Sequence, residues 1–263
     1  MQGENASVIW LTGASSGLGR SLALQLASSG AIVIASARNQ QALEELAAEQ
    51  PNIRPLRCDI TDPADCDSLP ARLGEITNHL DQAILNAGTC EYLDFPDPDW
   101  AAVRRVMEVN FFGTVNCVRI ALPLLRRSRD RRAQLVVVAS QVTSAPFPRA
   151  EAYGASKAAL QYFCDSLRID LARERIDVSV VNPGFVDTPL TRRNDFAMPF
   201  LMGAERAAEL IINRLKARPR RYAFPFRLSL LLALSKLFPG LWQKLVAPAE
   251  QYPKARTGEG VDS

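Results

Sequence analysis

The chain has 263 residues, of which 48% are hydrophobic and 22% charged, with a formal net charge of +3. A chain of this length and composition buries a sizeable core, so a single α/β domain is the expected organisation. The small net charge, without a basic run interleaved with aromatic residues, argues against nucleic acid as a partner.

Short runs of aliphatic and β-branched residues alternate with segments of helical periodicity. Five runs predict strands, at residues 8–11, 31–36, 83–86, 134–140 and 178–182. Six periodic segments predict helices, at residues 18–28, 40–49, 63–78, 99–126, 151–174 and 204–217. Strands that are apolar on both faces and separated by helices predict an α/β fold with a doubly wound parallel sheet of the Rossmann type. Ligands are then expected outside the carboxyl ends of the strands.

The first predicted strand runs directly into TGASSGLGR, which places three glycines at the turn into the first helix. Glycines permit a tight turn, and they let backbone N–H groups and the positive helix N-terminus approach a pyrophosphate. A purely structural turn would also use glycine, but the position between the first strand and the first helix favours a dinucleotide site. The residues expected to bind the cofactor here are Gly13, Ser15, Ser16, Gly17, Leu18 and Gly19.

The segment EAYGASKAAL, residues 151–160, places Tyr153 four positions before Lys157, so the two side chains share one face of the predicted helix. The spacing alone is a weak signal, because it also arises by chance. Lys157 is, however, the first of only five lysines in a chain whose other cations are arginines. The position therefore favours an ammonium over a guanidinium.

Several segments together are similar to one known family. TGASSGLG at 12–19, NAG at 86–88, Asn110, Ser140, YGASK at 153–157 and NPGFVDT at 182–188 resemble the short-chain dehydrogenase/reductase family over about residues 6–220. The resemblance implies a Rossmann-type fold and nicotinamide-dependent interconversion of an alcohol and a carbonyl compound. By position it implies four catalytic residues, which are the acid/base Tyr153, its activator Lys157, the carbonyl-orienting Ser140 and the relay residue Asn110.

The resemblance also implies cofactor contacts further along the chain. It matches Asp59 to an adenine-contacting acid, for which a helix cap is the alternative role. Leu85 departs from the family pattern, in which asparagine is frequent at this position. The other residues that it assigns to the cofactor pocket are Asn86, Ala87, Gly88, Tyr153, Lys157, Pro183, Gly184 and Thr188.

The end of the second predicted strand indicates the type of cofactor. An NAD enzyme of this family would present a carboxylate there, whereas this chain has Ala37 followed by Arg38. A guanidinium without a neighbouring acid accommodates a 2′-phosphate, so NADP is the expected cofactor. An ordinary solvated loop arginine is the alternative interpretation of Arg38.

The proton chemistry implied for the tyrosine needs help from its surroundings. A phenol with the usual pKa of about 10 requires roughly 4 kcal/mol of differential stabilisation of the phenolate to reach a pKa of about 7. Lys157 and the positive ring of the oxidised cofactor are the available charges. Ser140 follows its predicted strand, where a hydroxyl can donate to a substrate oxygen as charge develops on it.

Two later segments are apolar. In PLTRRNDFAMPFLMG, residues 189–203, a lid over the substrate is implied by the resemblance. The side chains considered for its pocket, with simple packing as the alternative, are Phe185, Leu190, Phe196, Met198 and Phe200. Residues 222–245 are strongly apolar but too short between their prolines to span about 30 Å of bilayer. A partner-subunit contact, a cap over the substrate and an interfacial membrane helix all remain open.

The remaining expectations concern organisation and location. Five scattered cysteines without Cys-x-x-Cys spacing, and one histidine, predict neither disulfides nor a metal site and favour a reducing, cytoplasmic location. The N-terminus lacks signal-peptide features. We expect an oxidoreductase domain over 1–220 and an apolar extension with a polar tail over 221–263.

The predicted function is NADP-dependent interconversion of a hydrophobic carbonyl compound and its alcohol by a homodimer or homotetramer. Two other classes remain as alternatives. One is a catalytically silent NADP-binding regulatory or scaffold protein, against which the complete set of catalytic residue types argues. The other is a peripheral membrane-associated module, for which residues 222–245 alone would be responsible.

Overall fold

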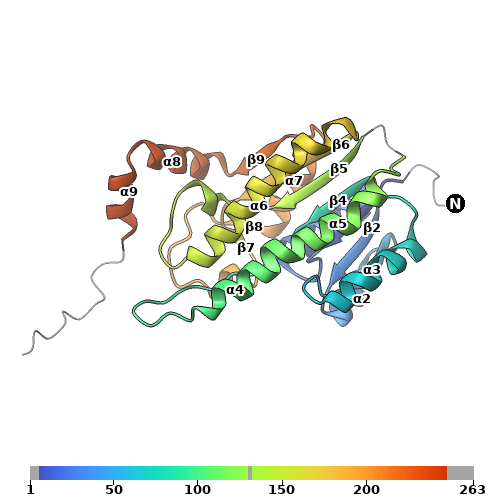
Figure 1. The fold of residues 1–263 in the computed structure, drawn as a ribbon, viewed down its shortest axis with the longest axis horizontal. Coiled ribbons are helices and arrows are strands. Elements are labelled where there is room, and N and C mark those ends of the chain that lie inside the picture. Colours follow the sequence, from blue (N-terminus) through green and yellow to red (C-terminus); the bar gives the residue numbers. More distant parts are fainter. Residues whose placement is uncertain (1–5, 130–131, 248–263) are drawn as a thin grey trace, which may run out of the picture.

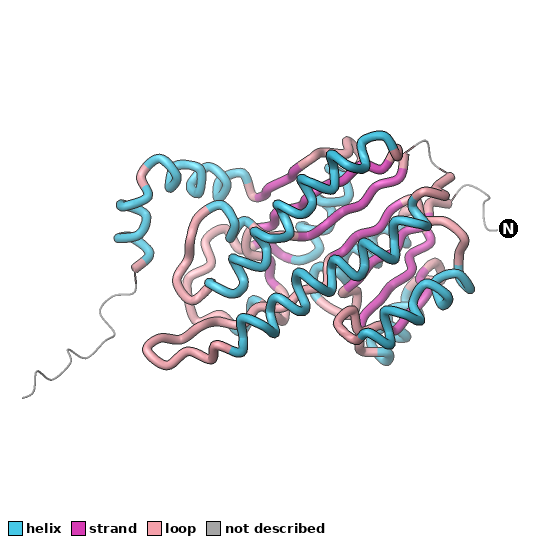
Figure 2. Tube along the Cα trace, in the orientation of Figure 1, coloured by secondary structure: helices cyan, strands magenta, loops and turns pink. Residues whose placement is uncertain are grey.

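A seven-stranded parallel sheet forms the centre of the computed structural model, which describes residues 6–129 and 132–247. Helices cover both faces of the sheet (Figures 1 and 2). The strands lie in the order β3-β2-β1-β4-β5-β6-β9, and all of their pairings are parallel. The direction of winding reverses between β1 and β4, which is where an open α/β sheet binds ligands. The predicted doubly wound sheet is confirmed.

The strands follow the apolar runs of the sequence. They are β1 Val8–Thr12, β2 Ile32–Ala37, β3 Ile53–Arg57, β4 Gln82–Leu85, β5 Ala133–Val138, β6 Ile176–Pro183 and β9 Arg221–Phe224. A separate short parallel pair consists of β7 Val186–Asp187 and β8 Met202–Gly203. β1 and β5 are buried along their whole length, as expected of strands covered on both faces.

The helices predicted from the sequence begin and end close to the predicted positions, and two more helices follow in the apolar extension. They are α1 Gly17–Ser28, α2 Gln40–Glu49, α3 Pro63–Ile76, α4 Ala101–Met107, α5 Gly113–Leu125, α6 Glu151–Asp170, α7 Ala204–Leu215, α8 Phe226–Leu237 and α9 Pro239–Val246. Side-chain caps fix two of the starts, since Asn39 accepts from the N–H of Ala42 and Asp62 accepts from that of Ala64. The predicted helix over 99–126 is interrupted by a π-helical turn, Glu108–Phe112, that joins α4 to α5.

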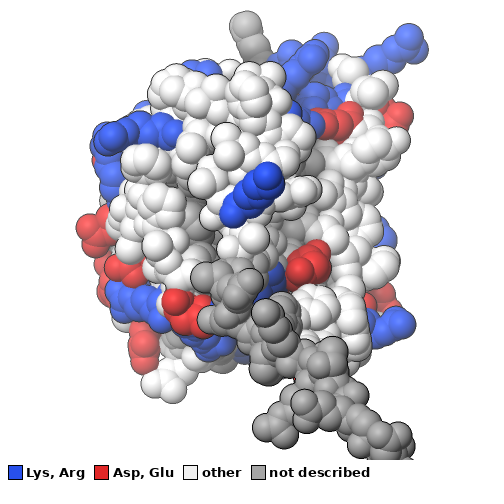
Figure 3. All heavy atoms as spheres, turned by 90° about the vertical axis from the view of Figure 1, so that its left-hand side faces the viewer, with Lys and Arg blue, Asp and Glu red and all other residues white. Residues whose placement is uncertain are grey.

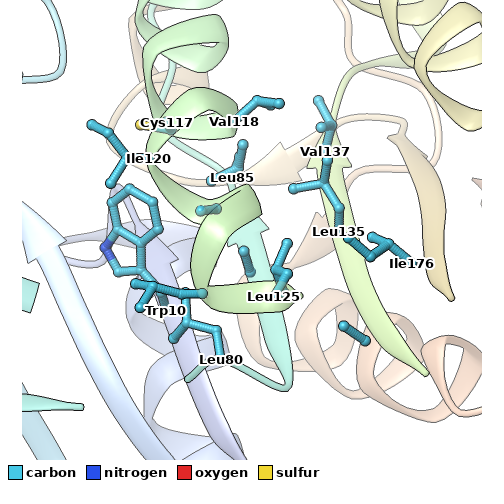
Figure 4. Close-up of a cluster of buried hydrophobic side chains, with 14 of the residues drawn as sticks. Trp10, Leu80, Leu85, Cys117, Val118, Ile120, Leu125, Leu135, Val137 and Ile176 are labelled. Carbon is cyan, nitrogen blue, oxygen red and sulfur yellow. The ribbon is translucent and has the colours of Figure 1, made fainter. Parts of the chain in front are cut away.

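Alternation along the strands divides the core between the two faces of the sheet. On one face Trp10, Leu85 and Leu135 pack under α5, with α3 and α6 on the same side (Figure 4). On the other face Leu11 and Ile84 pack under α1, α2 and α7. Side chains two residues apart on a strand share a face, so a continuous apolar run supplies both halves of the core.

The C-terminal part of the described chain continues the sheet before it leaves it. β9 pairs with β6, so the sheet extends four residues beyond the expected domain end at residue 220. α8 and α9 follow and lie together at one end of the molecule (Figure 1). Residues 248–263, the predicted polar tail, and residues 1–5, on which the signal-peptide expectation partly rests, lie outside the described residues. Among residues 6–129 and 132–247, every helix is too short or too polar to cross a bilayer.

Candidate active site

A cavity of about 750 Å³ opens at the carboxyl ends of the parallel strands. Most of the residues singled out in the sequence line it. They are Gly13, Ser15, Ser16, Gly17, Leu18, Gly19, Arg38, Asp59, Asn86, Ala87, Gly88, Ser140, Tyr153, Lys157, Pro183, Gly184 and Thr188. Asn110 is the one predicted site residue that lies behind this lining. The fold thus brings segments up to about 175 residues apart into one site.

The glycine turn between β1 and α1 has no room for side chains. Gly13 has a φ of +69°, and a Cβ atom on it would lie 2.8 Å from the Cα of Ala87. A Cβ on Gly19 would lie 2.0 Å from the carbonyl oxygen of Gly13. The protein's own backbone packing therefore requires both glycines, whether or not a ligand is bound. The Ser16 side chain makes no capping hydrogen bond, so the start of α1 beside the cavity suits a phosphate group.

Three candidate catalytic side chains come together from β5 and α6. The hydroxyl of Tyr153 is hydrogen-bonded to the side chain of Ser140, the residue that begins the turn after β5. Lys157 is buried, and its Nζ donates to the carbonyl oxygen of Val138 at 3.0 Å. The same Nζ lies 5.9 Å from the centre of the Tyr153 ring. The arrangement places a proton donor, a second hydroxyl and a cation on one wall of the cavity.

The pKa values of this pair differ from the sequence-based expectation. Desolvation raises the pKa of Tyr153 to about 12, although its hydrogen bond to Ser140 acts in the opposite direction. Burial lowers the pKa of Lys157 to about 8. The expected lowering of the tyrosine pKa toward 7 is absent from the protein alone, because the ammonium binds Val138 instead of the phenol oxygen. Tyr153 is consequently a protonated phenol at neutral pH, which is the form that a general acid needs.

Asn110 joins two segments that carry the site. It is fully buried in the π-helical turn, where its Oδ1 accepts from the N–H of Thr89 at 2.8 Å. Its Nδ2 donates to the carbonyl oxygen of Thr89 and to the hydroxyl of Ser156, both at 2.9 Å. A Cβ on Gly88 would lie 3.1 Å from Asn110 Oδ1 and 3.3 Å from Lys157 Nζ. These hydrogen bonds hold the segment after β4 against α6, and the relay role implied for Asn110 stays a prediction.

Asp59 stabilises the turn after β3. Its Oδ1 accepts from the N–H of Thr61 at 3.0 Å and from the Thr61 hydroxyl at 2.7 Å. Burial raises the pKa of Asp59, but these hydrogen bonds and the charge of Arg38 outweigh burial and leave the pKa below its usual value. The helix-cap alternative is wrong, because Asp62 caps α3. Asp59 is thus an ionised acid on the cavity wall.

Arg38 differs from the neighbouring cations in its partners. Arg20 is paired with Glu49, and Arg57 lies 3.2 Å from Asp65; neither arginine lines the cavity. Arg38 lines the cavity, is exposed, and has no ion-pair partner within the part of the chain that the structure describes. Its guanidinium is therefore available to an anionic group in the cavity.

Sequence reasoning missed a polar cluster that ties three loops together. The hydroxyl of Tyr92 donates to Asn194 Oδ1 at 2.7 Å. Arg149 binds Asp94 at 2.5 Å and Asp195 at 2.6 Å, and its guanidinium lies 5.0 Å from the centre of the Tyr92 ring. These contacts join the segments that follow β4, β5 and β7. No sequence motif indicates these contacts, because the residues that make them lie in different parts of the sequence.

The apolar residues considered for the substrate pocket divide into two groups. Leu190 lines the cavity, as considered from the sequence. Glu91 and Arg105 line it too, although sequence reasoning did not identify them. The other four, Phe185, Phe196, Met198 and Phe200, are outside the lining. Aromatic packing explains two of these, since the rings of Phe185 and Phe196 meet edge to face with centres 6.1 Å apart.

Residues 7–197 match the family model described as short chain dehydrogenase. The chain belongs to the short-chain dehydrogenase family. This match confirms the resemblance seen in the motifs. The strand order and the solved neighbours confirm the Rossmann-type fold.

Two relatives illustrate the range of this short-chain dehydrogenase family. The chain is 35% identical to 11-beta-hydroxysteroid dehydrogenase A of Sesamum indicum over 191 residues, which cover 70% of this chain and 54% of that protein. The chain thus spans about half the length of that relative. It is 34% identical to an uncharacterized oxidoreductase of Myxococcus xanthus over 234 residues, which cover 87% of this chain and 91% of the relative.

Solved structures of short-chain dehydrogenases share the fold. A Burkholderia cenocepacia short chain dehydrogenase in complex with NADP superposes with a TM-score of 0.80 and 25% identity, over 93% of this chain and 99% of that one. The Pseudomonas aeruginosa RhlG/NADP active-site complex gives a TM-score of 0.67 and 29% identity, over 73% of this chain and 77% of that one.

Proposed function

We propose that this short-chain dehydrogenase interconverts a hydrophobic carbonyl compound and its alcohol by hydride transfer, with NADP as its cofactor. The observation that carries the proposal is one cavity with Tyr153, Ser140 and Lys157 on its wall and the glycine turn and Arg38 elsewhere in its lining. Relatives named as hydroxysteroid dehydrogenases and structural neighbours described as NADP complexes support the same chemistry. Assembly as a homodimer or homotetramer in the cytoplasm stays a prediction.

The lining fits the chemical groups of NADP. The start of α1 suits the pyrophosphate, and the guanidinium of Arg38, which pairs with no carboxylate among the described residues, suits the 2′-phosphate. The Asp59 carboxylate is available to the adenosine end and the Lys157 ammonium to ribose hydroxyls. The remaining residues proposed for the pocket are Gly13, Ser15, Ser16, Gly17, Leu18, Gly19, Asn86, Ala87, Gly88, Tyr153, Pro183, Gly184 and Thr188. When bound, NADPH supplies the hydride that adds to the carbonyl carbon.

The protein's own groups handle the proton and the developing charge. As the carbonyl carbon gains its C–H bond, the Tyr153 hydroxyl gives its proton to the carbonyl oxygen, which becomes the alcohol O–H. Ser140 holds that oxygen with a hydrogen bond; its Oγ already accepts from the N–H of Val142 at 3.1 Å, which orients it. The Lys157 ammonium, 5.9 Å from the centre of the Tyr153 ring and hydrogen-bonded to Val138, favours through its charge the phenolate that Tyr153 leaves behind. Asn110 keeps α6 and the segment after β4 in register.

A panel of lipophilic ketones, aldehydes and secondary alcohols tests this function. We expect cofactor turnover, followed by nicotinamide absorbance, with apolar members of the panel and NADPH or NADP. Turnover with NADH is expected to be weaker. NADPH binding without turnover of any compound would instead support a catalytically silent cofactor-binding protein.

Arg38→Ala is expected to weaken NADPH binding by about ten- to a hundred-fold and to leave NADH binding nearly unchanged. A charge-assisted pair with a phosphate is worth about 1.5 to 3 kcal/mol, and NADH lacks that phosphate. Adding Ala37→Asp is expected to increase the loss, since it places a carboxylate against the phosphate and offers an acceptor to the ribose of NAD. Fluorescence titration of both cofactors measures the change.

The matched controls for this prediction are Arg20→Ala and Arg57→Ala, which remove cations engaged with Glu49 and Asp65. Both controls are expected to bind NADPH and NADH like the wild type. Equal losses for the two cofactors in Arg38→Ala, or no loss for either, would show that Arg38 does not set the preference.

A further inference from the structure

α8 and α9 expose an unusual concentration of large apolar side chains. Eight of the seventeen that are exposed in the described part of the chain fall within residues 226–245. They are Phe226, Leu230, Leu231, Leu234, Leu237, Phe238, Leu241 and Leu245, between 43% and 76% exposed. We call these eight residues the outer apolar face. A patch of this kind marks a surface that binds something, because scattered single side chains are the norm on monomers.

The opposite sides of the two helices are already packed against the protein. Leu228 and Leu232 of α8 are buried against Ala145, with Phe147 beside them. The Trp242 side chain of α9 donates to the carbonyl oxygen of Pro146 at 2.7 Å. Because the inner sides of α8 and α9 already pack against the protein, the outer apolar face does not close over the cavity. Within residues 6–129 and 132–247 nothing covers the outer apolar face, since its side chains are 43% to 76% exposed.

The charged side chains of the helices that carry this face are all of one sign. Residues 226–247 contain three charged side chains, Arg227, Lys236 and Lys244, and no acid. None of the three forms an ion pair with a carboxylate among residues 6–129 and 132–247. Figure 3 views the end of the molecule where α8 and α9 lie, and uncharged atoms occupy much of its visible surface.

This charge pattern distinguishes two occupants of the face. In a two-fold symmetric dimer the same patch meets itself, so cations on one copy would approach cations on the other. An anionic lipid surface instead complements the lysines and the arginine while its acyl region receives the leucines and phenylalanines. α8 has 12 residues, about 18 Å of helix, which suits a position in the plane of the interface and not across the bilayer.

We infer that the outer apolar face binds the surface of a membrane rich in anionic lipid. The contact is peripheral, made by the leucines and phenylalanines of α8 and α9 and strengthened by Arg227, Lys236 and Lys244. The inner side of α8 lies beside the candidate active site, because Gly184 lines the cavity and a Cβ on it would lie 2.7 Å from Cδ2 of the buried Leu228.

Flotation of the full chain with lipid vesicles tests this inference without substrate or turnover. One set of vesicles is phosphatidylcholine alone, and the other contains equal parts of phosphatidylcholine and phosphatidylglycerol. We expect the wild type to bind the anionic vesicles about ten-fold or more tightly, because each basic residue near such a surface contributes about five-fold. High salt is expected to reduce this difference.

Three variants divide the apolar contribution from the electrostatic one. Leu230→Gln with Leu234→Gln and Leu237→Gln is expected to lose about ten-fold or more of binding to anionic vesicles. Lys236→Gln with Lys244→Gln is expected to lose most of the preference for anionic lipid. The matched control is Ile76→Gln with Ile169→Gln, two exposed apolar residues on α3 and α6, and it is expected to bind like the wild type. Circular dichroism and NADPH titration establish that each variant is folded.

Two results would overturn the inference. One is the absence of wild-type binding to anionic vesicles, or equal binding by the wild type and both α8–α9 variants. The other is a leucine variant whose molar mass by light scattering falls by half in the absence of lipid, while the wild type fails to float. That result would show that a second copy of the chain covers the face.

Discussion

Replacing Tyr153 with phenylalanine is expected to lower turnover by about a hundred- to ten-thousand-fold, the range that a general acid contributes. The phenylalanine ring fills the space of the tyrosine ring in the cavity wall, so NADPH binding is expected to stay within a few-fold of the wild type. The expected loss of turnover comes from the missing hydroxyl proton. The Tyr153 hydroxyl lies beside Ser140 on the cavity wall, where it can give that proton to a substrate. Steady-state rates and fluorescence titration measure the two effects separately.

Tyr162→Phe is the matched control for this substitution, because Tyr162 lies on the same helix and is 79% exposed. It is expected to turn over substrate like the wild type. If Tyr153→Phe retained more than a tenth of wild-type activity, Tyr153 would not be the acid/base.

Lys157→Arg is expected to fail as a substitute, although it keeps the positive charge. Lys157 is only 4% exposed and its Nζ fits between the carbonyl oxygen of Val138 and the space beside Gly88. A planar guanidinium is larger and cannot place one compact donor there. We expect turnover to fall by about a hundred-fold or more, as when a positioned catalytic group is lost. Near-normal rates would remove the explanation for a lysine in this arginine-rich chain.

The pH dependence provides a second readout of the same residue. Because burial lowers the pKa of Lys157 to about 8, the side chain is protonated below that pH and neutral above it. Tyr153 keeps its proton over this range, since its pKa is raised to about 12. A neutral Lys157 no longer stabilises the Tyr153 phenolate that forms during reduction. Carbonyl reduction should therefore slow as the pH rises through about 8. The residual rate of Lys157→Arg should not decline over this pH range. The rate of the surface variant Lys216→Arg should decline like that of the wild type.

The strands that could be predicted from the sequence are the ones buried on both faces. β1 and β5 are continuous apolar runs because helices cover both of their sides. The predicted strands do not include β3 and β9, which are the two edges of the sheet. Edge strands need less apolar surface, and β3 even contains Pro55, which cannot donate to a neighbouring strand. The sequence consequently predicts residues 221–224 as part of the apolar extension, whereas they form β9.

Most of the predicted site residues lie either just after a strand or in the turn that leads from a strand into a helix. Such positions meet at the carboxyl edge of a parallel sheet, so chain order alone brings them together. The Arg149 cluster has no such signal, since its partners Asp94 and Asp195 lie on separate loops. The pKa of Tyr153 was also beyond sequence reasoning, because it depends on burial and on where the Lys157 ammonium points.

The most direct test of the proposed chemistry follows the transferred hydrogen. Wild-type protein is incubated with a lipophilic ketone and NADPH that carries two deuterium atoms on the nicotinamide C4, and the product is analysed by mass spectrometry. Hydride transfer predicts an alcohol with one deuterium on its carbinol carbon, formed in the wild type and nearly absent with Tyr153→Phe. An alcohol without deuterium at that carbon, or equal deuterated product from the two proteins, would contradict the proposed function.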